Sequence, residues 1–207
     1  MKNKFIMFIF IFGLIFGTNN IVTNYTNNFE IISNNPSFID IDISIGEIII
    51  DEVNINNEIY TSLSLEGSYP STKSSGSPNL PMLNQLIEIP HDATIRVEII
   101  EDKTSLYDLS LYGVNTQIIP VQPSISKSSN SEEIIFQKNE QSYLKSLYKK
   151  ELIEVQDKGL LRQVRIGNIL ISPIEYNPID NNIILHENIK IRLYFDNANI
   201  ALTNQYK

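Results

Sequence analysis

The sequence predicts an all-β protein, an antiparallel, jelly-roll-like β-sandwich with one short helix near residues 140–153. Isoleucines alternate with polar residues from Ile39 to Ile45, so one face of this segment is apolar and the other polar. The same period of two returns near the C-terminus, from Ile189 to Phe195. Turn residues separate such segments at intervals of about ten positions, which is typical of short strands packed as two sheets.

The first part of the chain is expected to form strands after an irregular start. Residues 19–36 are rich in asparagine and lack a sustained period, which indicates a spacer or a ragged first strand. After the alternating isoleucines, strands are expected over residues 47–53 and 58–65, with a turn at residues 54–57 between them. Residues 68–78 are rich in serine, glycine and proline and are expected to form a loop.

One helix and several further strands are expected in the remainder. Tyrosine and leucine recur at helical spacing in residues 140–153, and the serine-rich residues 125–133 indicate a loop. Strands are expected over residues 86–89, 95–100, 108–112, 116–121, 161–166, 169–171, 183–186 and 189–195. We expect one domain over residues 37–196 and a short tail over residues 197–207.

Residues 1–18 have the pattern of a secretory signal peptide. Two lysines form a basic start, residues 5–16 are an almost unbroken apolar run, and Gly17 and Thr18 are the best small residues for cleavage. A membrane-spanning helix needs about 20 apolar residues, so this run is short for an anchor. We expect the segment to be removed and the chain to be secreted, periplasmic or at the cell surface, without a membrane contact after removal. The alternative is an uncleaved anchor.

Composition and charge limit the classes of function. The formal net charge is −8, and the densest basic pair, Lys149-Lys150, is followed at once by Glu151. Such a balance argues against a nucleic-acid partner, because binding to phosphates needs a concentrated basic patch. The chain contains no cysteine, which excludes disulfides, a cysteine nucleophile and a lipid-modified cysteine. Its stability must therefore come from a packed core.

Few residues are of the types that carry catalysis or bind metal. The two histidines, His91 and His186, lie in sequences typical of turns between strands, and we expect both to be solvated there. Asp40 and Asp42 could bind calcium, but their spacing equally fits the solvated face of a strand. The sequence contains no metal motif, phosphate-binding glycine loop or nucleophile elbow. We therefore expect no catalytic residue, no metal and no cofactor.

Tyr143 and Tyr148 are the remaining candidates for a binding surface. They could form a platform for a sugar ring, which would fit a secreted carbohydrate-binding or adhesion module. A helix face that packs on the sandwich is the alternative explanation of the same spacing. A small hydrolase that depends on one of the histidines is a third class to be tested.

Two proline-rich signatures punctuate the chain, Gly76-Ser-Pro-Asn-Leu-Pro81 and Pro173-Ile-Glu-Tyr-Asn-Pro178. Proline fixes φ and removes a hydrogen-bond donor, so the first signature should be an extended edge or a turn. The second ends in Asn177-Pro178 and is followed by Asp180-Asn-Asn182, which is a strong turn signal before the closing strands. On physical grounds, both signatures shape the backbone between strands and do not form a functional site.

In this order, the signatures and the segments between them resemble the propeptide of gingipain-type cysteine peptidases. The resemblance covers roughly residues 60–196. Its pieces run from Gly76-x-Pro-x-Leu-Pro81 and Ile87-Glu-Ile-Pro90 through residues 95–100, Ile119-Pro-Val-Gln-Pro123, Phe136 and Tyr143 to Leu161-Arg-Gln-Val-Arg165, residues 171–178 and residues 189–195.

The resemblance implies a prodomain that assists folding of a protease domain and keeps it latent until cleavage. In that family, inhibition is understood as a prodomain loop placing a basic side chain in the specificity pocket of the protease. The matching position is Lys127, on a polar loop over residues 124–130, and a lysine there implies a pocket that accepts lysine. Lys127 could also be an ordinary exposed lysine. Arg162 and Arg165 are alternatives, although both fall in an expected strand.

The catalytic domain of such a precursor has no counterpart before Lys207, where the sequence ends. We expect the chain to be a fragment or truncated gene product, the first part of a longer precursor, or a stand-alone inhibitor. In each case it is no enzyme by itself, and its expected partner is a gingipain-type cysteine protease domain.

Overall fold

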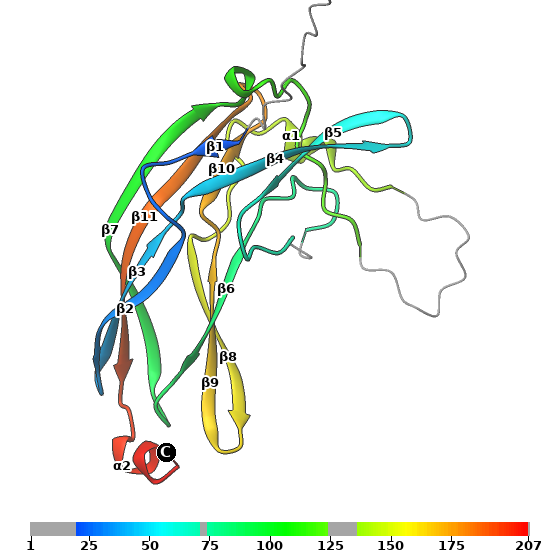
Figure 1. Ribbon diagram of the computed structural model, residues 1–207. Helices are drawn as coiled ribbons and strands as arrows, with labels where there is room; N and C mark the ends of the chain where they lie inside the picture. Colours follow the sequence, from blue (N-terminus) through cyan, green and yellow to red (C-terminus); the bar gives the residue numbers. More distant parts are fainter. Residues whose placement is uncertain (1–19, 71–73, 124–135, 207) are drawn as a thin grey trace, which may run out of the picture.

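The computed structural model describes residues 20–70, 74–123 and 136–206, and strands make up most of it (Figure 1). The elements along the chain are β1 (Ile21–Val22), β2 (Asn28–Asn35), β3 (Phe38–Ser44), β4 (Glu47–Ile55), β5 (Glu58–Ser64), β6 (Leu83–Glu88), β7 (Thr94–Asp108), the 3₁₀ helix η1 (Leu109–Tyr112), α1 (Glu140–Tyr143), β8 (Ile153–Leu161), β9 (Val164–Ile171), β10 (Ile174–Asn177), β11 (Asn182–Asp196) and α2 (Ile200–Gln205).

The larger sheet is organised around β11. Strand β7 pairs with β11 in antiparallel fashion along its whole length. The other side of β11 pairs first with β10 and then with β3, and β2 lies beyond β3. Inward-facing residues of the paired strands meet in register, so that Ile191 lies opposite Ile41, and both are fully buried. The alternation predicted for these two segments is confirmed.

A smaller antiparallel sheet, in the order β6–β9–β8, forms the second layer (Figure 1). Ile169 on β9, and Ile89 directly after the end of β6, belong to the same buried core as the inward side chains of β3 and β11. Gly167 on β9 permits this packing, because a Cβ at this position would lie 2.2 Å from Cδ1 of Ile89. The predicted antiparallel β-sandwich is confirmed.

A third sheet, in the order β1–β4–β5, forms an arm at one end of the molecule. The β4–β5 hairpin projects away from the long layer of β7 and β11 (Figure 1). Extended segments pair with one another here through single bridges, Thr61 with Ile118 and Pro78 with Pro120. The first signature is therefore an extended segment, as predicted.

Residues 19–36 contribute two strands, so the spacer interpretation is wrong and the first-strand interpretation is right. Ile21 of β1 is fully buried against β4, and β2 pairs with β3. The side chain of Asn35 closes the β2–β3 turn by accepting hydrogen bonds from the backbone N–H groups of Ser37 and Phe38. Most residues of β2 are exposed because it is the outer strand of its sheet. An edge strand of this kind shows little alternation in sequence.

The helix expected over residues 140–153 is only one turn long, because α1 ends at Tyr143. Leu144, which helical spacing would have buried, is 74% exposed. Further on, the chain is extended, since the backbone of Tyr148 exchanges two hydrogen bonds with that of Tyr176, at 2.6 and 2.9 Å. Tertiary pairing has overridden the local helical period.

The strands expected at residues 183–186 and 189–195 are one strand, β11. The register with β7 shifts between His186 and Asn188, where Glu187 forms a bulge, and again between Lys190 and Ile191. Because β7 pairs on both sides of the bulge, the chain continues in the same direction and the expected turn does not form.

Two other expected strands contain turns. Residues 108–112 include the 3₁₀ helix η1, and Gly113 ends it in the left-handed conformation at φ 78°. Residues 161–166 are interrupted at Arg162-Gln163, which have φ values of 48° and 70° and connect β8 to β9.

The expected tail over residues 197–207 contains α2, which is tied to the sandwich. The backbone N–H of Asn199 donates to the carbonyl of His91 at 2.7 Å, and the N–H of His91 donates to Oγ1 of Thr203 at 2.9 Å. The ring of Tyr206 lies 5.5 Å from that of His91. The folded unit thus extends beyond residue 196. Within the described ranges, no helix is long and apolar enough to cross a membrane.

Candidate functional site

Lys127, the candidate inhibitory residue, lies in the segment 124–135, outside the described residues. The structure does show how the chain is held on either side of that segment. We call residues 121–123, residues 136–139 and Gly76 the loop anchor. The loop anchor belongs to the end of the molecule that carries the arm.

Gln122 and Gln137 form the central contact of the loop anchor. Nε2 of Gln122 donates to the backbone carbonyl of Gln137 at 2.9 Å, and Oε1 of Gln122 accepts from the backbone N–H of Gln137 at 3.0 Å. The side-chain amide of Gln122 thus reproduces the two hydrogen bonds of a strand pair. It joins the two ends of the intervening segment.

Gly76 connects the same two ends through its backbone. Its N–H donates to the carbonyl of Val121 at 2.7 Å, and its carbonyl accepts from the N–H of Asn139 at 2.8 Å. A Cβ at Gly76 would lie 2.8 Å from the backbone nitrogen of Asn139, and the φ of Gly76 is 82°. Both facts require glycine at this position. The first signature therefore supports the loop anchor directly, a role that the sequence analysis did not assign to it.

Phe136 anchors the second end of the segment in apolar surroundings. Its ring centroid lies 5.4 Å from that of Tyr60 on β5. The hydroxyl of Tyr60 donates to a carboxylate oxygen of Glu58 at 2.6 Å. Burial, together with this carboxylate, raises the pKa of Tyr60 to about 12. Tyr60 is therefore neutral at physiological pH, so the ring that contacts Phe136 carries no charge of its own.

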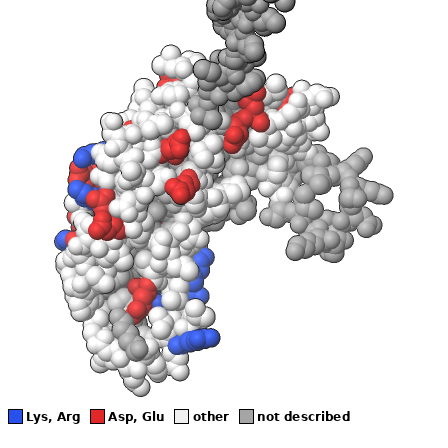
Figure 2. Space-filling model, in the orientation of Figure 1, with Lys and Arg blue, Asp and Glu red and all other residues white. Residues whose placement is uncertain are grey.

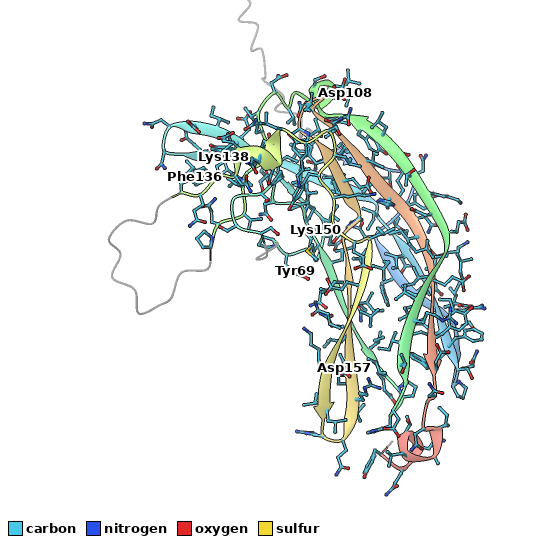
Figure 3. All side chains as sticks on the ribbon, turned by 180° about the vertical axis from the view of Figure 1, so that it is seen from behind. Tyr69, Asp108, Phe136, Lys138, Lys150 and Asp157 are labelled. Carbon is cyan, nitrogen blue, oxygen red and sulfur yellow. The ribbon has the colours of Figure 1, made fainter. Side chains whose placement is uncertain are left out.

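Helix α1 follows the loop anchor directly and is fixed by buried polar contacts. The hydroxyl of Tyr143 donates to the carbonyl of Ile118 at 2.7 Å, and burial raises the pKa of Tyr143. Ser142 and Ser77 share a buried hydrogen bond at 2.9 Å. Nζ of Lys138 lies 5.2 Å from the centroid of the Tyr143 ring. Phe136 and Lys138 are labelled in Figure 3, at the end of the molecule with the arm.

The loop anchor makes the two ends of the 124–135 segment a rigid base. Ordering a loop costs conformational entropy. Contacts that already hold its two ends reduce the free energy that binding to a partner must supply to order it. The arrangement is suited to presenting a side chain to another protein.

The tyrosines proposed as a sugar platform do not form one. Tyr143 is 4% exposed and Tyr148 is 8% exposed. Their rings contribute to the interior of the sandwich, which agrees with the packing alternative rather than with carbohydrate binding.

His186 was expected in a solvated turn, and this expectation is wrong. It lies within β11 and is 8% exposed. Its Nδ1 lies 2.8 Å from Oδ1 of Asp102 on β7, and its Nε2 lies 3.6 Å from Oε1 of Glu175 on β10. The continuity of β11 through the bulge explains this burial. His91 does lie in a turn, and its Nε2 is 2.8 Å from the carbonyl of Gln163.

Asp40 was expected on a solvated strand face, but it is 9% exposed and paired. Nε and Nη2 of Arg192 donate to its two carboxylate oxygens at 2.6 and 2.8 Å, and these hydrogen bonds lower the pKa of Asp40. Asp42 accepts from Nδ2 of Asn188 at 2.6 Å. In the described part of the chain, no group of three or more potential ligands is arranged to hold a metal ion.

The two arginines weighed as alternatives to Lys127 differ in their surroundings. Arg165 donates to Oδ2 of Asp157 through Nε at 3.0 Å and Nη2 at 2.7 Å, and to the carbonyls of Pro90 and Ala93 through Nη1. Its guanidinium is thus held within the fold. Arg162 was expected within a strand over residues 161–166. It lies instead in the turn between β8 and β9 and is exposed.

The chain belongs to the Propeptide_C25 family, whose model matches residues 23–206. This match begins before residue 37 and ends after residue 196, so the family unit includes β2 and α2 and starts directly after β1. The resemblance to gingipain-type propeptides is confirmed.

Among curated proteins, the chain is similar to Lys-gingipains of Porphyromonas gingivalis. The relatives Lys-gingipain HG66 and Lys-gingipain W83 are each 32% identical over 167 residues, which is 80% of this chain and 10% of the relative. The chain therefore spans about a tenth of the length of the curated relatives that it matches.

Two solved structures share the fold. One, described as giving structural insight into zymogenic latency of gingipain K from Porphyromonas gingivalis, has a TM-score of 0.80 and 29% sequence identity, with 86% of this chain and 98% of that chain covered. The other is a complex of the pro- and mature domains of RgpB from the same organism, with a TM-score of 0.68, 18% identity and coverage of 82% and 86%. At this lower identity, the second structure supports the fold alone.

Proposed function

We propose that this chain is the prodomain of a secreted gingipain-type cysteine endopeptidase precursor and has no catalytic activity of its own. It binds the protease domain, assists its folding and keeps it latent until cleavage. Family membership and the similarity to Lys-gingipains and to the gingipain K structure support this proposal. Residues 1–18 act as the signal peptide that directs secretion.

The loop anchor is the observation that carries the proposal. Gln122 and Gly76 hold the two ends of the 124–135 segment with four hydrogen bonds to the backbone of residues 121, 137 and 139. A segment whose ends are fixed in this way binds a cleft at a lower entropic cost than one with free ends. Such a base is what a loop needs in order to block an active site.

Lys127 is the residue of this segment that enters the specificity pocket. Its ammonium group is a compact positive charge on a long stem, which matches an acidic pocket that selects lysine. It occupies the pocket as a substrate side chain does.

The test compares the purified chain with a Lys127→Ala variant as inhibitors of mature Lys-gingipain. Lys145→Ala is the matched control, because Lys145 is an exposed lysine outside the 124–135 segment. Removing one partner of a buried charge pair costs about 2–5 kcal/mol, so Lys127→Ala should weaken inhibition by about thirtyfold or more. Lys145→Ala should have no effect. Equal inhibition by the parent and Lys127→Ala would remove Lys127 from the mechanism.

A further inference from the structure

The tip of the β8–β9 hairpin, residues 157–163, carries two large exposed apolar side chains at the end of the smaller sheet. Every residue of this hairpin tip is exposed. Leu160 and Leu161 are 65% and 66% exposed, although they are adjacent and point to opposite sides of the strand. Because these two large apolar side chains are exposed, they do not contribute to the buried core. The tip is therefore a candidate contact surface.

The turn at the hairpin tip is made of residues that do not favour its conformation. Arg162 and Gln163 have φ values of 48° and 70°, which define a two-residue hairpin turn that prefers asparagine and glycine. The same protein uses Asn56-Asn57 for the equivalent turn between β4 and β5, with φ values of 53° and 66°. At the hairpin tip, an arginine occupies a position whose backbone conformation favours asparagine or glycine. Strain that the fold does not require points to a function of the side chain.

The hairpin tip and its base are basic, in contrast to the whole chain. Residues 157–165 contain Lys158, Arg162 and Arg165 against a single carboxylate, Asp157, while the chain has a net charge of −8. Arg165 and Asp157 pair with each other. Among the residues that the structure describes, Arg162 has no hydrogen-bond or ion-pair partner and projects freely. Figure 2 shows lysine and arginine side chains gathered at the lower end of the molecule, where this hairpin lies in Figure 1.

The base of the hairpin tip is rigid. Arg165 on β9 forms two hydrogen bonds with Asp157 on β8. It also donates to the carbonyls of Pro90 and Ala93, which holds β9 against the turn between β6 and β7. The carbonyl of Gln163 lies 2.8 Å from Nε2 of His91, which joins the turn itself to the body of the sandwich. The backbone that carries the apolar and cationic side chains is therefore held in a fixed position, which favours binding.

Figure 3 shows how the hairpin tip and the loop anchor are arranged. Asp157 is labelled near the tip of the hairpin, and Phe136 and Lys138 lie at the opposite end of the molecule. Both ends lie on the side away from the long layer of β7 and β11 in Figures 1 and 3. A partner that engages the loop anchor along this side can reach the hairpin tip.

We propose that the hairpin tip is a second docking contact for the protease domain, in which Leu160 and Leu161 enter an apolar depression and Arg162 pairs with a carboxylate at its rim. This inference rests on the proposed function, which supplies the partner. The basic charge of the tip sets the chemistry of the complementary surface, which is apolar with an acidic border.

The test separates binding from folding by improving the turn while removing the contact. In the variant Arg162→Asn/Gln163→Gly, the turn gains its preferred residues, so the melting temperature should be equal to or above that of the parent. Affinity for mature Lys-gingipain, measured by biolayer interferometry, should nevertheless fall about tenfold. The variant Leu160→Ser/Leu161→Ser should lose a similar factor. Leu111→Ser is the control, because Leu111 is 80% exposed on η1, and it should bind as the parent does.

Each result decides between the proposals. Unchanged affinity of both tip variants, with binding by the parent intact, overturns the hairpin contact and leaves the proposed function standing. Absence of any complex between the parent chain and the protease overturns both. Vesicles of phosphatidylglycerol provide a further comparison. Binding of the parent to vesicles, lost in the tip variants while protease affinity is unchanged, would assign the tip to an anionic lipid surface instead.

Discussion

The side-chain amide of Gln122 is hydrogen-bonded to the backbone carbonyl and N–H of Gln137, at 2.9 and 3.0 Å. It thus makes the two hydrogen bonds that a residue of a neighbouring strand would make with its backbone. This single side chain joins the chain before residue 124 to the chain after residue 135. It lies in the Ile119-Pro-Val-Gln-Pro123 segment, whose prolines cannot donate backbone hydrogen bonds. The glutamine supplies the donor that the neighbouring prolines lack.

Replacing Gln122 with alanine should weaken inhibition of Lys-gingipain without unfolding the chain. Each hydrogen bond contributes about 1 kcal/mol, so the loss of two bonds should reduce inhibition by about thirtyfold as the ends of the segment separate. Gln85→Ala is the control, since Gln85 is exposed and, among the described residues, its side chain hydrogen-bonds only to the carbonyl of its neighbour Leu86, at 3.3 Å. The inhibition constants of the three proteins provide the measurement. An unchanged inhibition constant for Gln122→Ala would show that the contact between Gln122 and Gln137 does not position the 124–135 segment.

Replacing Gly76 with alanine should disturb the loop anchor more than the same change elsewhere. The new Cβ would approach the backbone nitrogen of Asn139 to 2.8 Å, in addition to the cost of a positive φ. Gly67→Ala has the positive φ, at 72°, but nothing within 4 Å of its Cβ, so it should show only the cost of the backbone conformation, about 1 kcal/mol. The crowding at Gly76 should add about 1–3 kcal/mol to the loss in the free energy of unfolding. Urea denaturation of both variants tests the difference, and equal losses would contradict it.

Removing the hydroxyl of Tyr143 should destabilise the fold more than removing that of Tyr194. In Tyr143→Phe the carbonyl of Ile118 loses a buried donor at 2.7 Å, which costs about 1–3 kcal/mol. The hydroxyl of Tyr194 donates to Glu98 at an exposed position, where water can take its place. Tyr194→Phe should therefore cost well under half as much. Denaturant midpoints that fall in the opposite order would refute the role given to Tyr143.

The pairing of Asp40 with Arg192 should make stability depend on pH in the acid range. Hydrogen bonds from Arg192 hold the pKa of Asp40 below its ordinary value of 3.8. A carboxyl group whose pKa is lower in the folded protein stabilises it at pH values above its unfolded pKa, and this contribution disappears as the pH falls through the folded value. Asp40→Asn should thus melt at a lower temperature than the parent at pH 7.

The difference between Asp40→Asn and the parent should narrow as the pH is lowered below about 4. Asp51→Asn is the control, because Asp51 is an exposed carboxylate on β4, and its melting temperature should follow that of the parent at all pH values. Melting curves recorded from pH 7 to pH 2 test this. A gap between Asp40→Asn and the parent that is constant over this range would contradict the ion-pair explanation.

Strands with one buried face could be predicted from the sequence, because their side chains alternate. Ile39 to Ile45 and Ile189 to Phe195 show that period, and both form central strands as expected. Strand β2 could be predicted only as one of two alternatives, a spacer or a ragged first strand, because an edge strand buries few side chains. The helical spacing around Tyr148 was misleading, since pairing with Tyr176 determines the backbone there.

Contacts between distant segments account for the parts of the candidate site that sequence could not provide. Asp102 and His186 are neighbours only because β7 and β11 run side by side through a bulge. The pairing of Gln122 with Gln137 likewise depends on where the chain returns, and nothing in local sequence indicates it. The importance of Lys127 was inferred from a family resemblance, and its role stays a prediction.

The most direct test of the prodomain function is a kinetic titration of mature Lys-gingipain with the purified chain. If the chain occupies the specificity pocket, the KM for a peptide substrate cleaved after lysine should rise with the concentration of the chain while kcat stays constant. Pretreatment of the protease with an irreversible inhibitor that fills the pocket should also weaken binding of the chain. Competitive inhibition is the result that the account predicts. Unchanged KM and kcat, with no complex detected, would contradict it.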